Sequence, residues 1–247
     1  MRTARVILFL ALMTLAGLHP AGAQAPLIAD LDSHLIAITT GFAGADVLLF
    51  GTTDGPGDVI VVVKGPVADV EVLRKERVAG LWINRKALGF QNVPAVYMMA
   101  SSKPLAQILP NDQRAFYQMG IEHVRMVPVS PNDGDLATFS QALIRAKQNS
   151  GLFSDQPARI LFIGDRLFRV NLRVPSTVPT GTYLAVVYLV RDQKVVGALT
   201  TPLVISKIGF GADIYDFAYR HSAAYGVIAV LVALFAGWLA HLVFRRG

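Results

Sequence analysis

The chain has 247 residues, of which 53% are hydrophobic, and it carries a formal net charge of +6 with a sequence pI near 9.7. It contains no cysteine, which excludes disulfide frameworks, thiol catalysis, cysteine-based zinc sites and covalent haem attachment. Four arginines lie at the extreme ends of the chain, and removing them from the 23 basic residues leaves 19 against 17 acidic ones. The remainder is nearly neutral and has no basic stripe with interleaved aromatic residues, so no nucleic-acid partner is expected.

Residues 1–23 have the three parts of an export signal. Two arginines precede an apolar run from Val6 to Gly17. That run is shorter than the ~20 residues that a helix needs to cross a bilayer. Ala21-Gly22-Ala23 then offers a cleavage site with small residues, so we expect the mature chain to begin at Gln24. The alternative is an uncleaved N-terminal anchor.

Residues 24–208 are predicted to form one mainly β periplasmic domain. Short segments rich in aliphatic and β-branched residues alternate with glycine, proline and aspartate, a pattern typical of strands and turns. The strands expected first are His34–Thr40, Ala45–Phe50, Asp58–Lys64, Val67–Leu73, Gly80–Asn84 and Ala95–Ala100. Their length and spacing predict an Ig-like β-sandwich with a wetted face. Trp82 is expected to anchor its core.

From residue 102 to about residue 152 the apolar period becomes helical, which predicts a two-helix insertion. Ser102 is expected to cap the first helix, which Pro110 interrupts. Asp135 is expected to cap the second helix, which should bury Leu136, Phe139 and Leu143 and stop at Gly151. Strands then return at Ala158–Ile163, Leu167–Val174, Thr182–Arg191 and Lys194–Ile205, with a tight turn at Asp192-Gln193.

The C-terminal part reads as a membrane anchor. Residues 222–244 are almost entirely apolar, and the 22 residues from Ala223 to Phe244 would reach ~33 Å as a helix, which is spanning length. Arg245 and Arg246 follow, and the positive-inside rule places this tail, residues 245–247, in the cytoplasm. The export signal independently requires the same orientation. We therefore expect a single-pass protein of the bacterial inner membrane with most of its chain in the periplasm.

Two features of this anchor bear on what it contacts. Residues 209–221 form an amphipathic pattern, with Phe210, Ile214, Phe217 and His221 on one helical face, which predicts a segment lying at the membrane surface. Small residues recur at four-residue spacing in the anchor, as expected where two helices pack closely in lipid. They are Ala229, Ala233 and Gly237, flanked by Ala236 and Ala240. The alternative is that such residues are simply common in membrane helices.

Candidate chemistry is sparse. If the segment Asp30 to His34 is extended, Asp30, Asp32 and His34 share one face and could bind a divalent metal. The competing interpretation is a polar outer face of the sandwich, since no second ligand cluster accompanies them. The chain has no Gly-x-Ser-x-Gly elbow and no phosphate-binding loop, so we expect no catalytic residues, no cofactor and no enzymatic activity. The charge run from Arg74 to Arg77 is interpreted as a solvated strand edge.

A set of segments, taken in order and followed by one C-terminal span, resembles the uncharacterised family of alphaproteobacterial transmembrane proteins. The segments are Gly41–Ala45, Val61–Pro66, Arg74–Arg77, Gly80–Asn84, Val93–Tyr97 and Pro179–Tyr183. The resemblance covers nearly the whole mature chain. It implies no catalytic residues, because the family has no assigned activity. It also implies a neighbourhood with permeases that resemble the TauE/SafE exporters of sulfite or organosulfonates, and hence a possible transporter partner.

Two hypotheses about function follow. The first is a membrane-anchored periplasmic accessory protein that binds a multi-pass transporter through its domain and the helix face with Ala229, Ala233 and Gly237. The second is a periplasmic sensor that binds a ligand or metal ion through Asp30, Asp32 and His34.

Overall fold

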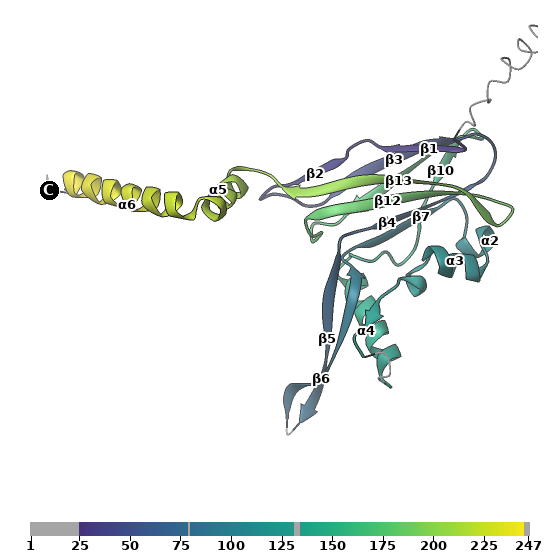
Figure 1. Ribbon diagram of the computed structural model, residues 1–247, viewed down its shortest axis with the longest axis horizontal. Helices are drawn as coiled ribbons and strands as arrows, with labels where there is room; N and C mark the ends of the chain where they lie inside the picture. The colour runs from purple at the N-terminus through teal and green to yellow at the C-terminus, as the bar shows by residue number, and fades with distance from the viewer. Residues whose placement is uncertain (1–24, 79, 131–133, 245–247) are drawn as a thin grey trace, which may run out of the picture.

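Two stacked sheets form the body of the protein in this computed structural model, and a long hairpin and two C-terminal helices extend from them (Figure 1). The structure describes residues 25–78, 80–130 and 134–244, with the backbone alone at 210–213, 216 and 243. The predicted export signal, residues 1–23, and the predicted tail, residues 245–247, lie outside the described residues. Strands make up 46% of the described residues and helices 27%, which confirms a mainly β protein.

The first sheet has four antiparallel strands in the order β1-β3-β11-β10. They are β1 (Leu27–Leu31), β3 (Ala45–Thr53), β11 (Leu167–Val174) and β10 (Leu161–Ile163). Burial alternates strictly along β1 and β11, because successive side chains of a strand point to opposite faces. One face of this sheet is therefore wet and the other is buried.

The second sheet has six strands in the order β2-β13-β12-β4-β7-β9. They are β2 (Leu35–Ile38), β13 (Lys194–Lys207), β12 (Gly181–Arg191), β4 (Asp58–Lys64), β7 (Tyr97–Ser101) and β9 (Ala158–Arg159). The two edge strands pair in parallel and the others antiparallel. The predicted turn joins β12 to β13, and Asp192 and Gln193 both have positive φ, as a two-residue hairpin loop of type I′ requires.

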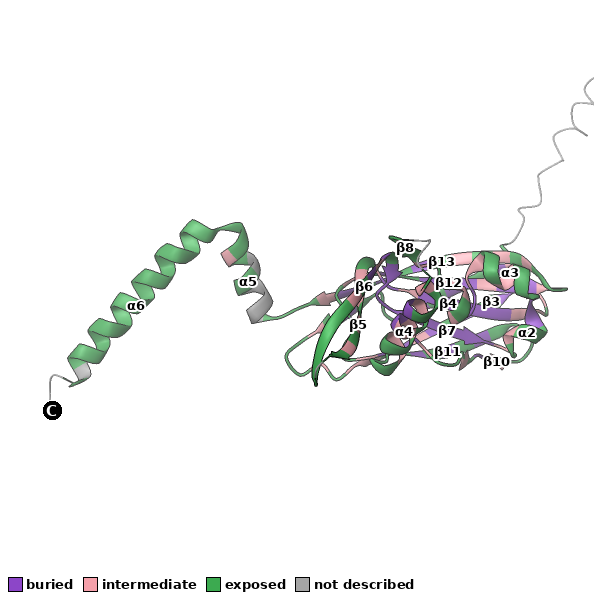
Figure 2. Cartoon of the chain, turned by 90° about the horizontal axis from the view of Figure 1, so that it is seen from below, coloured by how far each residue is buried: buried purple, intermediate pink, exposed green. Residues whose placement is uncertain are grey.

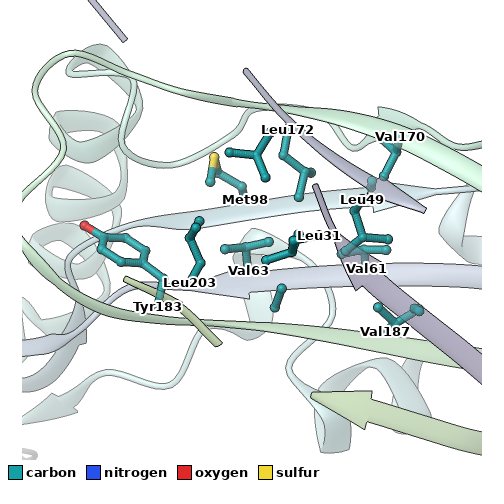
Figure 3. Packing of buried hydrophobic residues seen from close by; sticks show 14 of the residues in the cluster. Leu31, Leu49, Val61, Val63, Met98, Val170, Leu172, Tyr183, Val187 and Leu203 are labelled. Atoms are coloured by element: carbon teal, nitrogen blue, oxygen red, sulfur yellow. The ribbon is translucent and has the colours of Figure 1, made fainter. Parts of the chain in front are cut away.

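The main core lies between the facing surfaces of the two sheets. Leu49 and Leu172 from the first sheet pack among Val61 and Val187 from the second, and each is at most 4% exposed (Figure 3). Apolar burial of this kind is the dominant favourable contribution to folding. Since neither sheet can bury these side chains alone, the core depends on the stacking of both.

The segment between β7 and β9 covers the outer face of the second sheet. It contains α2 (Leu105–Ile108), α3 (Asn111–Tyr117), η1 (Ile121–His123), β8 (Val127–Pro128) and α4 (Leu136–Asn149). Its apolar side chains pack on Ile60 and Val62, which explains why β4 is buried on both faces. The described residues of this segment contain the α-helices α2, α3 and α4, where a two-helix insertion was expected. Helix α4 begins after Asp135 and ends before Gly151 as expected, but the Asp135 side chain makes no capping hydrogen bond and pairs with Arg74 and Lys86. The predicted cap at Ser102 is wrong, because its hydroxyl donates to Asp58 Oδ1 at 3.0 Å.

Residues 67–94 form one long hairpin outside the two stacked sheets. β5 (Val67–Val78) and β6 (Leu81–Pro94) pair along their whole length, and β8 adds a short third strand at the base. Phe139 and Leu143 of α4 pack on this base in a separate small core. The prediction that Val67–Leu73 and Gly80–Asn84 are short strands of the sandwich is wrong, as is the prediction of Trp82 as a core anchor. Trp82 lies near the hairpin tip and is 68% exposed.

The chain leaves the domain at the end of β13. Two helices follow, α5 (Phe210–Arg220) and α6 (Ser222–Phe244), and α6 projects far from the sheets (Figure 1). Its described side chains are all exposed, in contrast to the buried strands of the domain (Figure 2). The boundaries of both helices agree closely with the predicted segments 209–221 and 222–244.

Candidate functional site

Helix α6 has the composition and length of a membrane span. The 21 residues from Ser222 to Leu242 have a mean hydropathy of 2.2, and none of this stretch is buried inside the protein. At 1.5 Å per residue they reach ~32 Å, about the thickness of the hydrocarbon core of a bilayer. Large side chains such as Leu234 and Phe235 are more than 60% exposed. A helix that is apolar on all sides and uncovered by its own chain needs lipid or other helices around it.

The small residues Ala229, Ala233 and Gly237 lie on one face of α6. Four-residue spacing advances a helix by about one turn, so their Cα atoms line up along the axis. All three are exposed, and a Cβ atom added at Gly237 would meet no atom of the chain within 4 Å. This face is therefore free of contacts within the described part of the chain.

The preceding helix α5 carries several aromatic side chains next to the anchor. Tyr215 and Tyr219 stack at 5.4 Å and are 63% and 78% exposed, while Phe217 lies 5.6 Å from the ring of His221. Phe210, one of the four residues predicted to share the apolar face, has a side chain outside the described residues. Aromatic rings with polar atoms favour the boundary between lipid and water. Helix α5 thus has the chemistry expected of a segment at the membrane surface.

The candidate metal ligands Asp30, Asp32 and His34 lie where β1 gives way to β2. His34 Nε2 is 3.0 Å from Asp30 Oδ1, with about half of each side chain exposed. Asp32 Oδ1 instead accepts a hydrogen bond from the Leu48 N–H at 3.0 Å, and the Asp32 N–H donates to the Leu48 carbonyl oxygen at 2.9 Å. The extended run assumed from the sequence ends at Leu31. Asp32 lies just beyond it, and its carboxylate binds the backbone of β3 and does not join Asp30 and His34 on one strand face. Within the residues that the structure describes, no three acidic or histidine side chains converge as a metal site.

A buried polar cluster that sequence reasoning missed fastens α3 and the turn after it to the second sheet. The Tyr97 hydroxyl donates to the Gln118 carbonyl oxygen at 2.8 Å and accepts from the Gly120 N–H at 2.9 Å. Lys64 Nζ donates to Gln118 Oε1 at 2.8 Å. Burial raises the pKa of Tyr97 and lowers the pKa of Lys64. The backbone occupies both hydrogen-bonding capacities of the hydroxyl, so this cluster has a structural role.

His123 is another imidazole inside the domain. Its side chain is 14% exposed and its Nε2 lies 3.5 Å from Glu122 Oε1, far in the chain from Asp30 and His34. Arg114 Nη1 lies 3.5 Å from the same Glu122 oxygen. His123 therefore lies beside the Arg114–Glu122 ion pair next to α3 and is not part of the cluster near β1.

One open depression of about 440 Å³ lies between the turn before β4, α2 and the β12–β13 loop. Two of its charged side chains, Asp58 and Arg191, already have partners. Asp58 accepts from the Ser102 hydroxyl and pairs with Lys103 at 3.0 Å, while Arg191 Nε donates to the Pro56 carbonyl oxygen at 2.8 Å. Arg191 also hydrogen-bonds Asp54 and thereby lowers the pKa of that carboxyl group. A polar ligand would have to replace these bonds, so the depression is a poor candidate for a binding site.

The domain and its helix together define the class of the protein. A mainly β domain joined to one exposed apolar helix of spanning length is a membrane protein with a single candidate span. The chain belongs to the family described as "Putative transmembrane protein (Alph_Pro_TM)", whose model matches residues 26–246. No curated protein and no solved structure matches the chain. The family match confirms the transmembrane resemblance seen in the sequence, while the alphaproteobacterial origin and the permease neighbours stay predictions.

Proposed function

We propose that the protein is a non-enzymatic accessory protein of the bacterial inner membrane that holds an Ig-like β-sandwich in the periplasm and binds a multi-pass transporter. The proposed partner is a permease of the TauE/SafE kind. The observation that carries the proposal is α6, an apolar helix of spanning length with an uncovered face of small residues.

The proposed orientation is supported by charge at the two ends of the chain. Arg245 and Arg246 follow α6 directly, and positive residues next to a span favour the cytoplasmic side. The export signal in residues 1–23 favours translocation of the domain that follows it. We expect protease added to spheroplasts to degrade the domain, and carbonate washing to leave the protein in the membrane. Protection of the domain, or its release by carbonate, would contradict this topology.

The proposed partner contact is supported by the absence of side-chain bulk on one face of α6. Small residues allow two helix backbones to approach closely in lipid, where van der Waals packing drives association. Ala229, Ala233 and Gly237 leave such a face. Gly226 and Ala240 extend the same face toward the two ends of the helix. At 100° per residue each lies about 20° from Ala233 around the helix axis, closer than Ala229 and Gly237 at about 40°.

Crosslinking in native membranes followed by co-purification tests this contact. Ala233→Leu and Gly237→Leu are expected to reduce recovery of the partner, because each adds a side chain to the face that approaches it. A Cβ atom added at Gly237 meets no described atom of the chain within 4 Å, so Gly237→Leu is not expected to disturb the domain. Ala224→Leu is the matched control, since it lies about 180° from Ala233 and adds the same bulk. If the wild type and every variant are recovered only as a monomer without a crosslinked partner, the proposal is refuted.

The alternative function, a periplasmic ligand- or metal-binding sensor that uses Asp30, Asp32 and His34, has weaker support. Asp32 is engaged by the Leu48 backbone and Asp30 by His34. Binding would have to break at least one of these contacts. A thermal-shift panel of divalent metals and sulfur oxyanions distinguishes the two functions, because a ligand of the folded state raises its apparent stability.

A further inference from the structure

The β5–β6 hairpin leaves the domain at the same end as the membrane anchor. Lys64 at the end of β4 pairs with Leu184 of β12, and Leu184 pairs with Pro202 of β13, a few residues before β13 ends at Lys207. The hairpin extends the β4–β7 pair beyond this edge, since the Gly65 N–H donates to the Val96 carbonyl oxygen at 2.9 Å. Both views place the hairpin on the α5 side of the domain (Figures 1 and 2).

Helix α4 fixes the base of the β5–β6 hairpin. At about 3.4 Å per residue the 12 residues of β5 span ~40 Å, longer than any strand of the first sheet. Phe139 of α4 packs on the base, and Asp135 at the start of α4 lies 3.3 Å from Arg74 Nη1 and 2.9 Å from Lys86 Nζ. The hairpin tip therefore lies at a defined distance from the sheets.

Beyond Arg74 and Lys86 the hairpin exposes several large apolar side chains, which no described residue covers. Leu81 and Trp82 are 70% and 68% exposed, and Val78 and Ile83 are also exposed. Val78 pairs with Leu81 across the turn and Arg77 pairs with Trp82, so the apolar side chains occupy both faces of the tip. Exposed apolar clusters of this kind on a soluble surface mark an interaction site.

The charges beside the tip identify the surface that it fits. Lys75, Arg77 and Arg85 flank the apolar residues, against a single acid, Glu76, which already lies 3.2 Å from Arg74 and 3.5 Å from Arg85. Tryptophan favours the boundary between headgroups and acyl chains, and basic side chains are attracted to anionic headgroups. Anchoring by α6 confines the whole domain to the neighbourhood of the bilayer, which raises the effective concentration of the hairpin tip at the bilayer surface.

We infer that the hairpin tip, Val78 and Leu81–Ile83 with Arg77 and Arg85, inserts into the headgroup region of the bilayer that holds α6 and binds anionic lipid. This inference rests on the membrane anchoring in the proposed function and is independent of any transporter partner. It gives the domain a second membrane contact, which would restrict how the sheets are oriented on the bilayer.

The two tryptophans of the chain, Trp82 and Trp238, allow a direct test. Full-length Trp238→Phe and Trp82→Phe are reconstituted in phosphatidylcholine–phosphatidylglycerol vesicles, with phosphatidylcholine brominated near the carbonyl end of its chains. We expect about a twofold loss of Trp82 emission on addition of the brominated lipid, since bromine quenches indole at contact in the interface where Trp resides. Trp238 reports in parallel whether α6 is inserted.

Charge reversal supplies the matched control. Arg77→Glu with Arg85→Glu is expected to remove most of the Trp82 quenching, whereas Arg169→Glu with Arg173→Glu, on β11 of the first sheet, makes the same change in net charge and should preserve it. Quenching of Trp238 without Trp82 would overturn the inference and leave the anchor intact. Loss of both signals would overturn the anchoring as well. Shielding of Trp82 only in native membranes, without lipid quenching, would assign the tip to a protein partner and overturn the inference.

Discussion

The hydroxyl of Tyr97 should contribute strongly to the stability of the domain. Tyr97→Phe removes the acceptor of the buried Gly120 N–H and the donor to the Gln118 carbonyl oxygen, while the ring stays in place. A buried backbone group without a partner costs about 1–3 kcal/mol, so the two together predict a loss of about 2–6 kcal/mol. For a domain of this size, a loss of about 3 kcal/mol corresponds to about 6–12 °C in Tm.

Calorimetry and hydrogen exchange of the full-length protein would measure this effect. Differential scanning calorimetry gives Tm, and exchange followed by mass spectrometry reports the Gly120 amide, which should lose protection in Tyr97→Phe. Tyr188→Phe is the matched control, because Tyr188 packs in the same cluster and its hydroxyl makes no hydrogen bond among the described residues. An unchanged Tm together with unchanged protection of Gly120 would refute the assignment of Tyr97 as the link between α3 and the sheet.

Two further outcomes follow from individual groups. Burial raises the pKa of Tyr183 to about 12 and also raises that of Tyr97, so their contribution to stability should be complete below about pH 10 and lost as pH rises toward 12. Guanidinium unfolding at a series of pH values measures the free energy of unfolding, and tyrosinate absorbance measures the ionisation of the tyrosines. Ionisation of all seven tyrosines near pH 10 in the folded protein would contradict the raised pKa values. Asp32→Ala should cost about 1 kcal/mol through the lost bond to Leu48, with or without metal. A metal-induced rise in the Tm of the wild type that disappears in Asp32→Ala would favour the sensor.

Local patterns predicted many elements of the domain well. β11, β12, β13 and α4 lie where alternation and capping residues placed them, and the Asp192-Gln193 turn is confirmed. These features depend on side-chain periodicity and on turn geometry within a few residues, both of which can be read from neighbouring positions. The interpretation of Asp30, Asp32 and His34 as one face required an unbroken strand, and the backbone instead turns after Leu31.

The hairpin shows where such patterns stop being informative. Alternation indicated strands at Val67–Leu73 and Gly80–Asn84, which lie within the longer strands β5 and β6. It could not indicate that these strands pair with each other outside the two stacked sheets. Trp82 was read as a core residue because large aromatic side chains are usually buried. Its exposure depends on where α4 ends its contact with the hairpin, near Arg74 and Lys86. The Ala79-Gly80 pair between two alternating runs was the available signal for a hairpin.

The sequence by itself determined that this protein has a mainly β domain and an apolar C-terminal helix of spanning length, because hydropathy and strand alternation act along the chain. Only the tertiary structure decided which strands stack, that the Asp32 carboxylate accepts a hydrogen bond from the Leu48 N–H, and that Val78 and Leu81–Ile83 at the hairpin tip are uncovered. These outcomes depend on pairing between residues far apart in the chain. The free energy of such contacts is set by what each side chain meets in space, and no stretch of neighbouring residues contains that information.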